Sequence, residues 1–330
     1  MATYRDIKGD LIETVATDPS NPIEGDIWYN TTTGTLKGLG FRASAWASAN
    51  SISTGRYLLG SAGATYNATI VFGGVTNPGS SYRAQTESYD GTSWSELNDM
   101  GTARFLPAKH IGTSAAALAA GGYTGTTVSN VEEWNGSSWS EETNMPAVNR
   151  NQSGFGTQTA GVVAGGQGPA IWANVYHYDG SSWTSATALP VAKEQMGGCG
   201  TQTAGLVVCG RPPSGNVDTV EEYDGTNWTS GGTHPTAHGG NIVSGTQTDA
   251  FQYTGYVSNP FTTTANYDGT SWTANAALGT AISSSGGSTG QGSGSSQIQG
   301  GGSTPSTPSS TVSQEFTTAG TETKTVTTST

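Results

Sequence analysis

Four histidines and two cysteines are the side chains of this sequence best suited to hold a metal ion. Among the histidines, only His234 and His238 have the spacing of a two-histidine site, four residues apart beside a proline-containing turn. The chain contains an internal repeat of about 45 residues, however, and His238 stands where other units of that repeat carry Arg104 or Lys193. We therefore expect ordinary surface histidines here, and we expect the chain to use no metal ion, no cofactor and no catalytic residue.

Adjacent carboxylates could in principle supply an acid and a base. Glu132–Glu133 and Glu221–Glu222 recur in phase with a repeat, however, which favours a role in keeping strands soluble. Four aspartates precede glycines and are expected to be turn residues first. These are Asp90, Asp179, Asp224 and Asp268. The chain contains no G-x-S-x-G, nucleotide-loop or Walker sequence.

The two cysteines flank one predicted turn, Gly200–Ala204. If that turn centres near Gln202 and Thr203, Cys199 opposes Leu206 and is out of register with Cys209. Two cysteines are also too few for a disulfide framework. The sequence therefore predicts two free, mostly buried thiols.

The elements that carry these residues come from a repeat. The stretch EEYDGTNW (221–228) recurs with small changes, and its tryptophans lie at steps of 45, 44, 45 and 44 residues. A glycine pair or its variant runs in phase with it. Two markers at this period are typical of the blades of a β-propeller. The tryptophans are Trp94, Trp139, Trp183, Trp228 and Trp272, and the pairs are Gly73–Gly74, Gly121–Gly122, Gly165–Gly166, Cys209–Gly210 and Thr254–Gly255.

Each unit is interpreted as four short strands. In the third unit the strands begin with 151–155 and 161–166, joined by a turn at 156–160. Asp179–Gly180 then marks a tight hairpin, because both residues tolerate a positive φ. The Tyr and Trp of each hairpin are expected to pack between neighbouring blades.

These units resemble kelch repeats, in which a glycine pair is followed by a Tyr and, about six residues later, a Trp. A basic residue about ten positions after the Trp, another kelch feature, is present in most units. The resemblance covers residues 41–316 and implies an all-β, kelch-type β-propeller. The basic residues are Arg56, Arg104, Lys193 and His238, with Arg150 one position late.

Both chain ends contain degenerate pieces of the repeat. Trp46 lies 48 residues before Trp94 and suggests a fourth strand whose first three are missing upstream. From residue 278 onward, Gly300–Gly301 and TVSQEF (311–316) resemble the earlier strands of a blade. We predict six four-stranded blades, the last closed by strands from both ends, which removes an open sheet edge. Alternatively, the Gly/Ser-rich 283–310 is a linker and five blades remain.

The segments outside the predicted ring differ in character. Residues 1–40 contain an alternation of Ile27, Tyr29 and Leu36 around a Thr-Gly turn, which predicts a small hairpin. This run, GDIWYNTTTGTLKG, resembles the N-terminal segments of tail and appendage proteins of phages of marine bacteria, including cyanophages. The turn sequence GTQTA (156–160) also resembles sequences in the kelch-like proteins of such phages. We expect 1–40 to be an attachment segment and 317–330 a C-terminal tail.

Composition limits the possible partners. The net charge of −12 disfavours nucleic acid and anionic membranes. No apolar run reaches about 18 residues, and the N-terminus lacks the layout of a secretory signal. Although 49 glycines disfavour helices, nine Trp and thirteen Tyr argue for a folded, β-rich protein. Assembly in a host cytoplasm and a place in the virion are expected.

The repeats differ most after the glycine pair, in loops that should share one face of a propeller. Such loops present binding groups on a rigid scaffold. We expect a non-enzymatic tail or appendage protein, in several copies per particle, that attaches to other virion proteins through 1–40 and displays this face for adhesion to host glycans or for subunit contacts. The alternatives are a kelch-type carbohydrate-active or oxidase enzyme, and a packing subunit without adhesive function. The candidate binding residues are Tyr82, Tyr123, Trp172, Arg211, Tyr256 and Phe261.

Overall fold

The computed structural model describes residues 12–76, 81–287 and 296–326 and is all-β. Among these residues no helix is long and apolar enough to cross a membrane. The chain divides into two units: unit 1 comprises residues 1–44 with 318–330, and unit 2 comprises 45–317. The C-terminal residues expected to form a tail therefore belong with the N-terminal segment.

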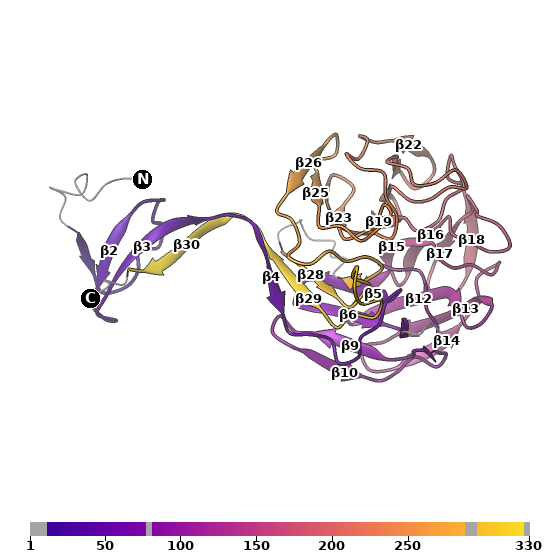
Figure 1. Cartoon of the computed structure of the whole chain (residues 1–330), viewed down its shortest axis with the longest axis horizontal. Helices are drawn as coiled ribbons and strands as arrows, with labels where there is room; N and C mark the ends of the chain where they lie inside the picture. Colours follow the sequence, from indigo (N-terminus) through magenta and orange to yellow (C-terminus); the bar gives the residue numbers. More distant parts are fainter. Residues whose placement is uncertain (1–11, 77–80, 288–295, 327–330) are drawn as a thin grey trace. The chain divides into compact units, whose positions relative to one another are not determined.

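Unit 2 contains four-stranded antiparallel sheets built from consecutive strands, in a propeller-like arrangement around a common centre (Figure 1). The first sheet has β5 (Gly60–Thr65), β6 (Ala68–Phe72), β9 (Thr86–Tyr89) and β10 (Trp94–Leu97). The second has β11 (Gly112–Thr113), β12 (Ala116–Tyr123), β13 (Thr127–Trp134) and β14 (Trp139–Glu142). The third has β15 (Ser153–Thr157), β16 (Ala160–Ala164), β17 (Val175–Tyr178) and β18 (Trp183–Ala186).

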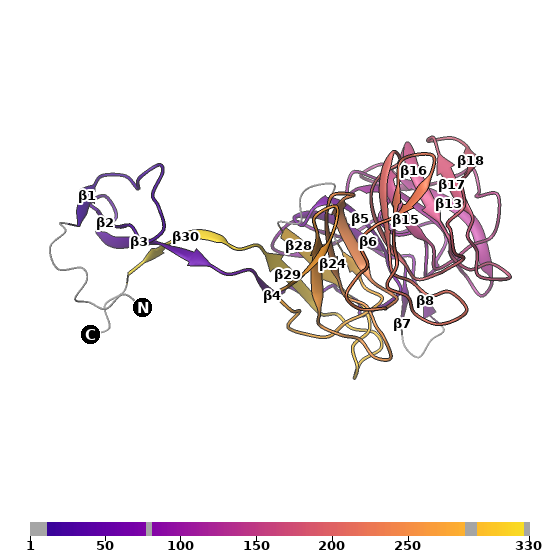
Figure 2. The same cartoon turned by 90° about the horizontal axis from the view of Figure 1, so that it is seen from above.

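The next two sheets repeat this order. The fourth has β19 (Gly197–Thr201), β20 (Ala204–Val208), β21 (Val220–Tyr223) and β22 (Trp228–Ser230). The fifth has β23 (Ile242–Thr246), β24 (Asp249–Tyr253), β25 (Thr264–Tyr267) and β26 (Trp272–Asn275). A two-stranded ribbon, β7 (Val75–Thr76) with β8 (Ser81–Tyr82), projects from the lower side of unit 2 in Figure 2.

Both ends of the repeat region contribute to a sixth sheet. It consists of β27 (Gly286–Gly287), β28 (Ser296–Gly300), β29 (Ser313–Thr317) and β4 (Ala45–Ala49), with Phe316 opposite Trp46. The expected pairing of the two ends is thus present. The expected glycine pair was wrong by one residue: Gly301 (φ 66°) and Gly302 (φ 106°) match the φ values of 64° and 100° at Gly73 and Gly74.

Apolar side chains join each sheet to the next. Five buried clusters each combine residues of two successive sheets, and a sixth consists of Ile52, Leu59 and Val71 with Trp94. Gly286 and Gly300 of the sixth sheet pack directly on Val71 and Trp94 of the first. The repeated tryptophans are half-buried at these joints. Four of them also donate an indole hydrogen bond to the preceding sheet or the residues that follow it. These are Trp139, Trp183, Trp228 and Trp272, at 2.9–3.0 Å.

Six residues at the centre connect the sheets through their backbones. Each lies before the first strand of its sheet and donates its N–H to the carbonyl oxygen of the equivalent residue one sheet earlier, over 2.7–3.4 Å. The series returns to its start, because Leu58 donates to Ser284. All six have φ between 54° and 66°, a conformation that costs energy outside glycine. They are Leu58, Leu106, Asn151, Gln195, Gly240 and Ser284.

Three of the basic residues of the repeat are buried and paired with acids. Arg104 Nη1 lies 2.5 Å from Glu132 Oε1, and both side chains are at most 1% exposed. Arg56–Glu87 and Lys193–Glu221 repeat this pair in the first and fourth sheets. The assignment of Glu132 and Glu221 to strand solubility was therefore wrong. Their carboxylates compensate cations that the fold buries.

The two repeated turns have separate structural roles. In the third sheet the hairpin connection spans four residues, and only Gly180 has a positive φ. Asp179 acts instead through its carboxylate, which accepts the N–H groups of Ser181 and Ser182 and so lowers its own pKa. The prediction of a tight Asp-Gly turn was thus wrong in detail. In the GTQTA turn, Gln158 donates to the carbonyl oxygens of Ala117 and Trp134 in the previous sheet.

Unit 1 is a four-stranded sheet in the order β1 (Glu13–Val15), β2 (Ile27–Asn30), β3 (Thr35–Arg42) and β30 (Gly320–Thr325). The predicted hairpin is confirmed, with Tyr29 opposite Leu36. One face of the sheet buries Trp28, whose indole N–H donates to Asp18 at 3.0 Å. Lys37 also contacts Asp18, at 2.7 Å.

Candidate functional site

The loops after the glycine pairs lie together with the segments that enter each first strand. In each of the six sheets, one residue of each segment forms an isolated β-bridge. We call the surface that these segments build the loop face. The GTQTA turns and the Asp hairpins lie at the other ends of the strands. The bridges are Tyr57–Val75, Phe105–Tyr123, Arg150–Gln167, Glu194–Arg211, Gly239–Tyr256 and Ser283–Ser303.

The centre of unit 2 holds a small cavity. Its walls include the six central residues together with Lys109, Gln152 and Asn241. Its volume of about 30 Å³ accommodates roughly one water molecule. Burial lowers the pKa of Lys109 to about 8. The cavity is too small for a sugar or a comparable substrate.

A wider groove lies on the loop face beside this cavity, with a volume of about 280 Å³. Tyr57 and Tyr256 supply two aromatic rings, and the hydroxyl of Tyr256 donates to Gln195 Oε1 at 2.6 Å. Asn216 donates to the carbonyl oxygen of Tyr256, which helps to hold this loop. The remaining lining is mostly hydroxyl and amide groups. The lining residues that complete it are Ser258, Asn259, Pro260, Ser283, Ser284 and Ser303.

A second group of aromatic side chains lies elsewhere on the loop face. Tyr82 and Tyr123 have ring centroids 6.1 Å apart, and each lies 5.2 Å from the ring of Phe105. The guanidinium of Arg150 lies 4.8 Å from the centroid of Tyr123, in a cation–π contact. Because these rings are half-buried and pack on one another, part of each remains available to a ligand.

The six predicted binding residues therefore do not form one patch. Tyr82 and Tyr123 meet each other, whereas Tyr256 lines the groove. Trp172 is half-buried and packs over Gly168, where an added Cβ would lie 2.4 Å from its ring. Arg211 is exposed.

The last of the six, Phe261, packs on His238 at 5.2 Å between ring centroids. Sequence reasoning missed Tyr57 and Phe105. Each of them directly follows a basic residue of the repeat, and that constant offset would have indicated a shared position.

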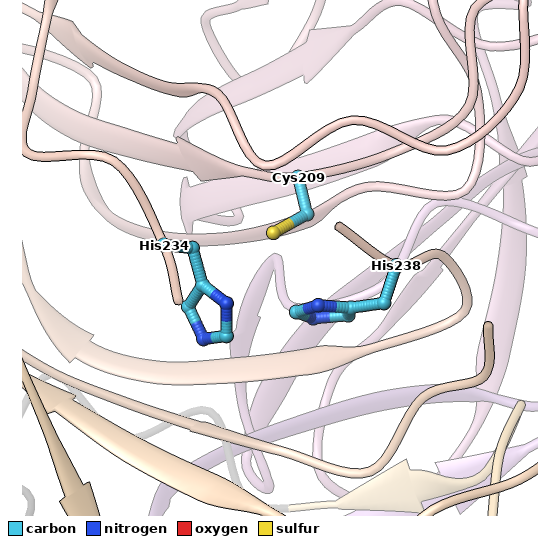
Figure 3. Close-up of side chains that lie close together, drawn as sticks. All are labelled: Cys209, His234 and His238. Carbon is cyan, nitrogen blue, oxygen red and sulfur yellow. The ribbon is translucent and has the colours of Figure 1, made fainter. Parts of the chain in front are cut away.

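The expectation of surface histidines at 234 and 238 was wrong. His234 is 4% exposed and His238 is 0% exposed, and both lie beside the buried Cys209 (Figure 3). One possible metal-ligand atom from each of the three lies within 4.8 Å of the others. The predictions for the cysteines are confirmed: both are free and buried, and Cys199 opposes Leu206.

A scan against protein-family models finds no family that matches this chain. A search of the curated proteins finds no significant match either.

Proposed function

We propose that unit 2 is a closed, six-bladed, kelch-type β-propeller, and that the protein is a non-enzymatic component of a phage tail or appendage. In this proposal unit 1 attaches the chain to other virion proteins. The propeller displays its loop face for adhesion to glycans on the host surface. The chain is assembled in the host cytoplasm and is present in several copies per particle.

Closure is supported at the centre and at the joints between sheets. The backbone hydrogen bonds of the six central residues form a circular series, and Gly286 and Gly300 of the sixth sheet pack on Val71 and Trp94 of the first. The buried basic residues stand at the positions expected from the kelch resemblance. Such a scaffold holds its loops rigidly, which lowers the entropic cost of binding.

The observation that carries the attachment role is the apolar surface of unit 1. Six of the nine large hydrophobic side chains that are exposed in the described residues belong to this small unit. Tyr29 lies opposite Leu36, whose carbonyl oxygen accepts the N–H of Val326, so these side chains share one face across three strands. Ile27 stands two residues from Tyr29 on that face. Exposed apolar faces of this kind mark interaction sites.

The adhesive role rests on the chemistry of the loop face. The groove beside the centre combines the rings of Tyr57 and Tyr256 with hydroxyl and amide groups. Sugars present apolar C–H faces and many hydroxyls, so they match both kinds of group. An open groove of this size gives weak binding for one copy, and several copies on one particle raise the overall strength.

Attachment can be tested in particles that carry a tagged copy of the gene. A chain restricted to residues 45–317 retains every strand of unit 2 and is expected to fold, but it should be absent from purified particles. A matched full-length variant, Tyr29→Ser with Val326→Ser, should be incorporated poorly. Normal incorporation of the 45–317 chain would refute the attachment role.

Adhesion can be tested on a glycan array with the full-length protein presented as multimers. Binding to defined glycans should be lost in Tyr256→Ala and retained in Thr226→Ala, a matched change on the hairpin side of the sheets. An array without signal, combined with a loop face protected from hydrogen exchange in assembled particles, would favour a packing subunit.

A further inference from the structure

The strongest unexplained feature of unit 2 is the place where the fourth sheet meets the loop that enters the fifth. Cys209 directly follows β20, and His234 and His238 lie in the loop between β22 and β23. Figure 3 shows the Cys209 sulfur directed toward the space between the two rings. The ring centroids of the histidines are 4.7 Å apart.

All three residues depart from the repeat. The positions equivalent to His234 carry only buried aliphatic or thioether side chains, each at most 4% exposed. They are Ile52, Met100, Met145, Leu189 and Leu278. The positions equivalent to His238 carry Arg56, Arg104, Asn149, Lys193 and Ile282. Three metal-binding side chains thus replace other types, and they do so at positions that meet in space.

A cysteine at position 209, where most other sheets have glycine, strains the backbone. Three of its equivalents, Gly73, Gly121 and Gly165, have φ between 60° and 65°, and an added Cβ there would lie 2.4–2.6 Å from a carbonyl oxygen of the next sheet. Only Thr254, in the fifth sheet, also carries a Cβ at this position among the described equivalents, with φ 60°. Cys209 adopts φ 58°, which is strained for a residue with a Cβ. The same geometry brings its side chain directly to His238.

A fourth difference from the repeat leaves His238 without an acidic side chain to pair with. The cations at the equivalent positions pair with Glu87, Glu132 and Glu221. In the fifth sheet that acidic position is Ala265. Burial lowers the pKa of His238 to about 3, and the neighbouring His234 adds to this effect. Burial also lowers the pKa of His234. Burial without an acidic partner favours a neutral imidazole, the form that binds metal ions.

The hydrogen bonds of the cluster are incomplete. The carbonyl oxygen of Thr236 lies 3.0 Å from Nδ1 of His234, 2.7 Å from Nδ1 of His238 and 3.7 Å from the sulfur of Cys209. The backbone N–H of Thr236 donates to Nδ1 of His234 at 3.2 Å, so this nitrogen acts as an acceptor, and the carbonyl oxygen receives at most the other two donors. Nε2 of the buried His238 has no hydrogen-bond partner among the described residues, whereas the His234 ring interacts with the Gln252 side chain.

We propose that Cys209, His234 and His238 bind one borderline-to-soft transition-metal ion, of the Zn²⁺ or copper type, that ties the fourth sheet to the loop entering the fifth. One thiolate and two imidazoles suit these metals. Tetrahedral zinc requires ligand atoms about 3.3–3.6 Å apart, so side-chain rotations must close the present separations by about 1 Å. The Cys209 thiol loses its proton to solvent as the metal–sulfur bond forms. Trp272 and Phe261 pack on the two histidines and exclude water.

This site is independent of the proposed virion role, because it lies in the scaffold and all three ligands are buried. Its expected role is structural. The full-length protein, stripped with a chelator under reducing conditions, should take up one equivalent of Zn²⁺ and release about one proton per ion. Thermal unfolding should shift upward with metal. Co²⁺ and Cu²⁺ arms, read by thiolate charge-transfer absorption, distinguish the preferred ion.

Three variants return the site to the residues found elsewhere in the repeat: Cys209→Gly, His234→Leu and His238→Asn. They are expected to fold, and each should weaken Zn²⁺ binding by about 100-fold or more. His177→Glu, which installs the residue found in other sheets, is the matched control and should bind like the parent. The proposal is overturned if the parent takes up none of the three ions, or if stoichiometric binding survives in all three variants.

Discussion

Removal of the Glu132 carboxylate should be among the most destabilising single changes in unit 2. Glu132 accepts hydrogen bonds from Arg104 Nη1 at 2.5 Å and from the backbone N–H of Gly101 and Thr102 at 2.6 and 3.2 Å. Glu132→Gln leaves the Arg104 guanidinium, which is 0% exposed, without its counterion. Breaking a buried pair from one side costs about 3–5 kcal/mol. For a unit of this size that corresponds to a fall in Tm of roughly 6–15 °C.

The sixth sheet suggests how this loss can be recovered. There the same two positions are Ile282 and Gln314, and the Gln314 amide accepts the N–H of Thr280 at 2.9 Å. The double variant Arg104→Ile with Glu132→Gln copies that arrangement and leaves no buried charge. Replacing both partners of a buried pair is often nearly neutral. We therefore expect the double variant to be more stable than Glu132→Gln by about 2 kcal/mol.

Urea unfolding followed by tryptophan fluorescence measures both changes. Glu222→Gln is a useful comparison, because Glu222 accepts one hydrogen bond from Tyr267 and faces no buried cation. The reasoning fails if Glu132→Gln costs less than about 1 kcal/mol, or if the double variant is no more stable than the single one.

Three further predictions concern other parts of the chain. Hydrogen bonds from Lys37, and then from Trp28, lower the pKa of Asp18 to about 2. The stability that the Asp18 carboxylate adds to unit 1 is therefore present above about pH 4 and is lost as the pH falls through 2. NMR of the Trp28 indole N–H should report this loss, and Asp18→Asn should remove the pH dependence. Gln202 donates to two carbonyl oxygens of the preceding sheet, so Gln202→Ala should cost about 1–2 kcal/mol in urea unfolding, and a cost near zero would contradict the bridging role. Burial lowers the pKa of His110 to about 3, so between pH 6.5 and 3 the unfolded chain binds a proton that the folded chain does not. The Tm should therefore fall as the pH decreases from about 6.5 toward 3. His110→Asn should make that fall shallower, because Asn tolerates the φ of 75° at this position.

The periodic signals were sufficient to predict most of unit 2. Tryptophans and glycine pairs recur because every sheet needs an apolar side chain at its joint and a residue with positive φ after its second strand. The pairing of the two ends was predictable because Trp46 still carries the signal of a fourth strand. The glycine pair of the last sheet was placed one residue early, because the chain is longer before it and the spacing no longer defines the register.

Burial of the polar residues could not be deduced from residue type alone. His234, His238 and Glu132 were assigned to the surface because such side chains are usually exposed. Aligning the repeats position by position would have corrected His234, since every equivalent residue is apolar. The loop-face residues were harder, because contacts such as Phe261 with His238 depend on loop paths that do not repeat.

The residues of the GTQTA turn have structural reasons that are independent of any relationship to phage proteins. Gly156 has a φ of 96°, and an added Cβ there would lie 2.3 Å from the Ala160 carbonyl oxygen. Gln158 bridges to the previous sheet. Both residues are therefore required by the geometry of the joint, so this motif does not by itself support a virion origin.

The pairing of the two chain ends in one sheet is the claim on which the rest depends, and a cross-link tests it most directly. Ala47 and Glu315 are opposite each other in β4 and β29, at a separation suited to a disulfide. With oxidised glutathione, Ala47→Cys with Glu315→Cys should form an intramolecular disulfide as readily as His177→Cys with Thr184→Cys, the equivalent pair in the third sheet. Ser48→Cys with Glu315→Cys, one residue out of register, should not. Failure of the first pair while the third-sheet pair closes would contradict a ring completed by both ends of the chain.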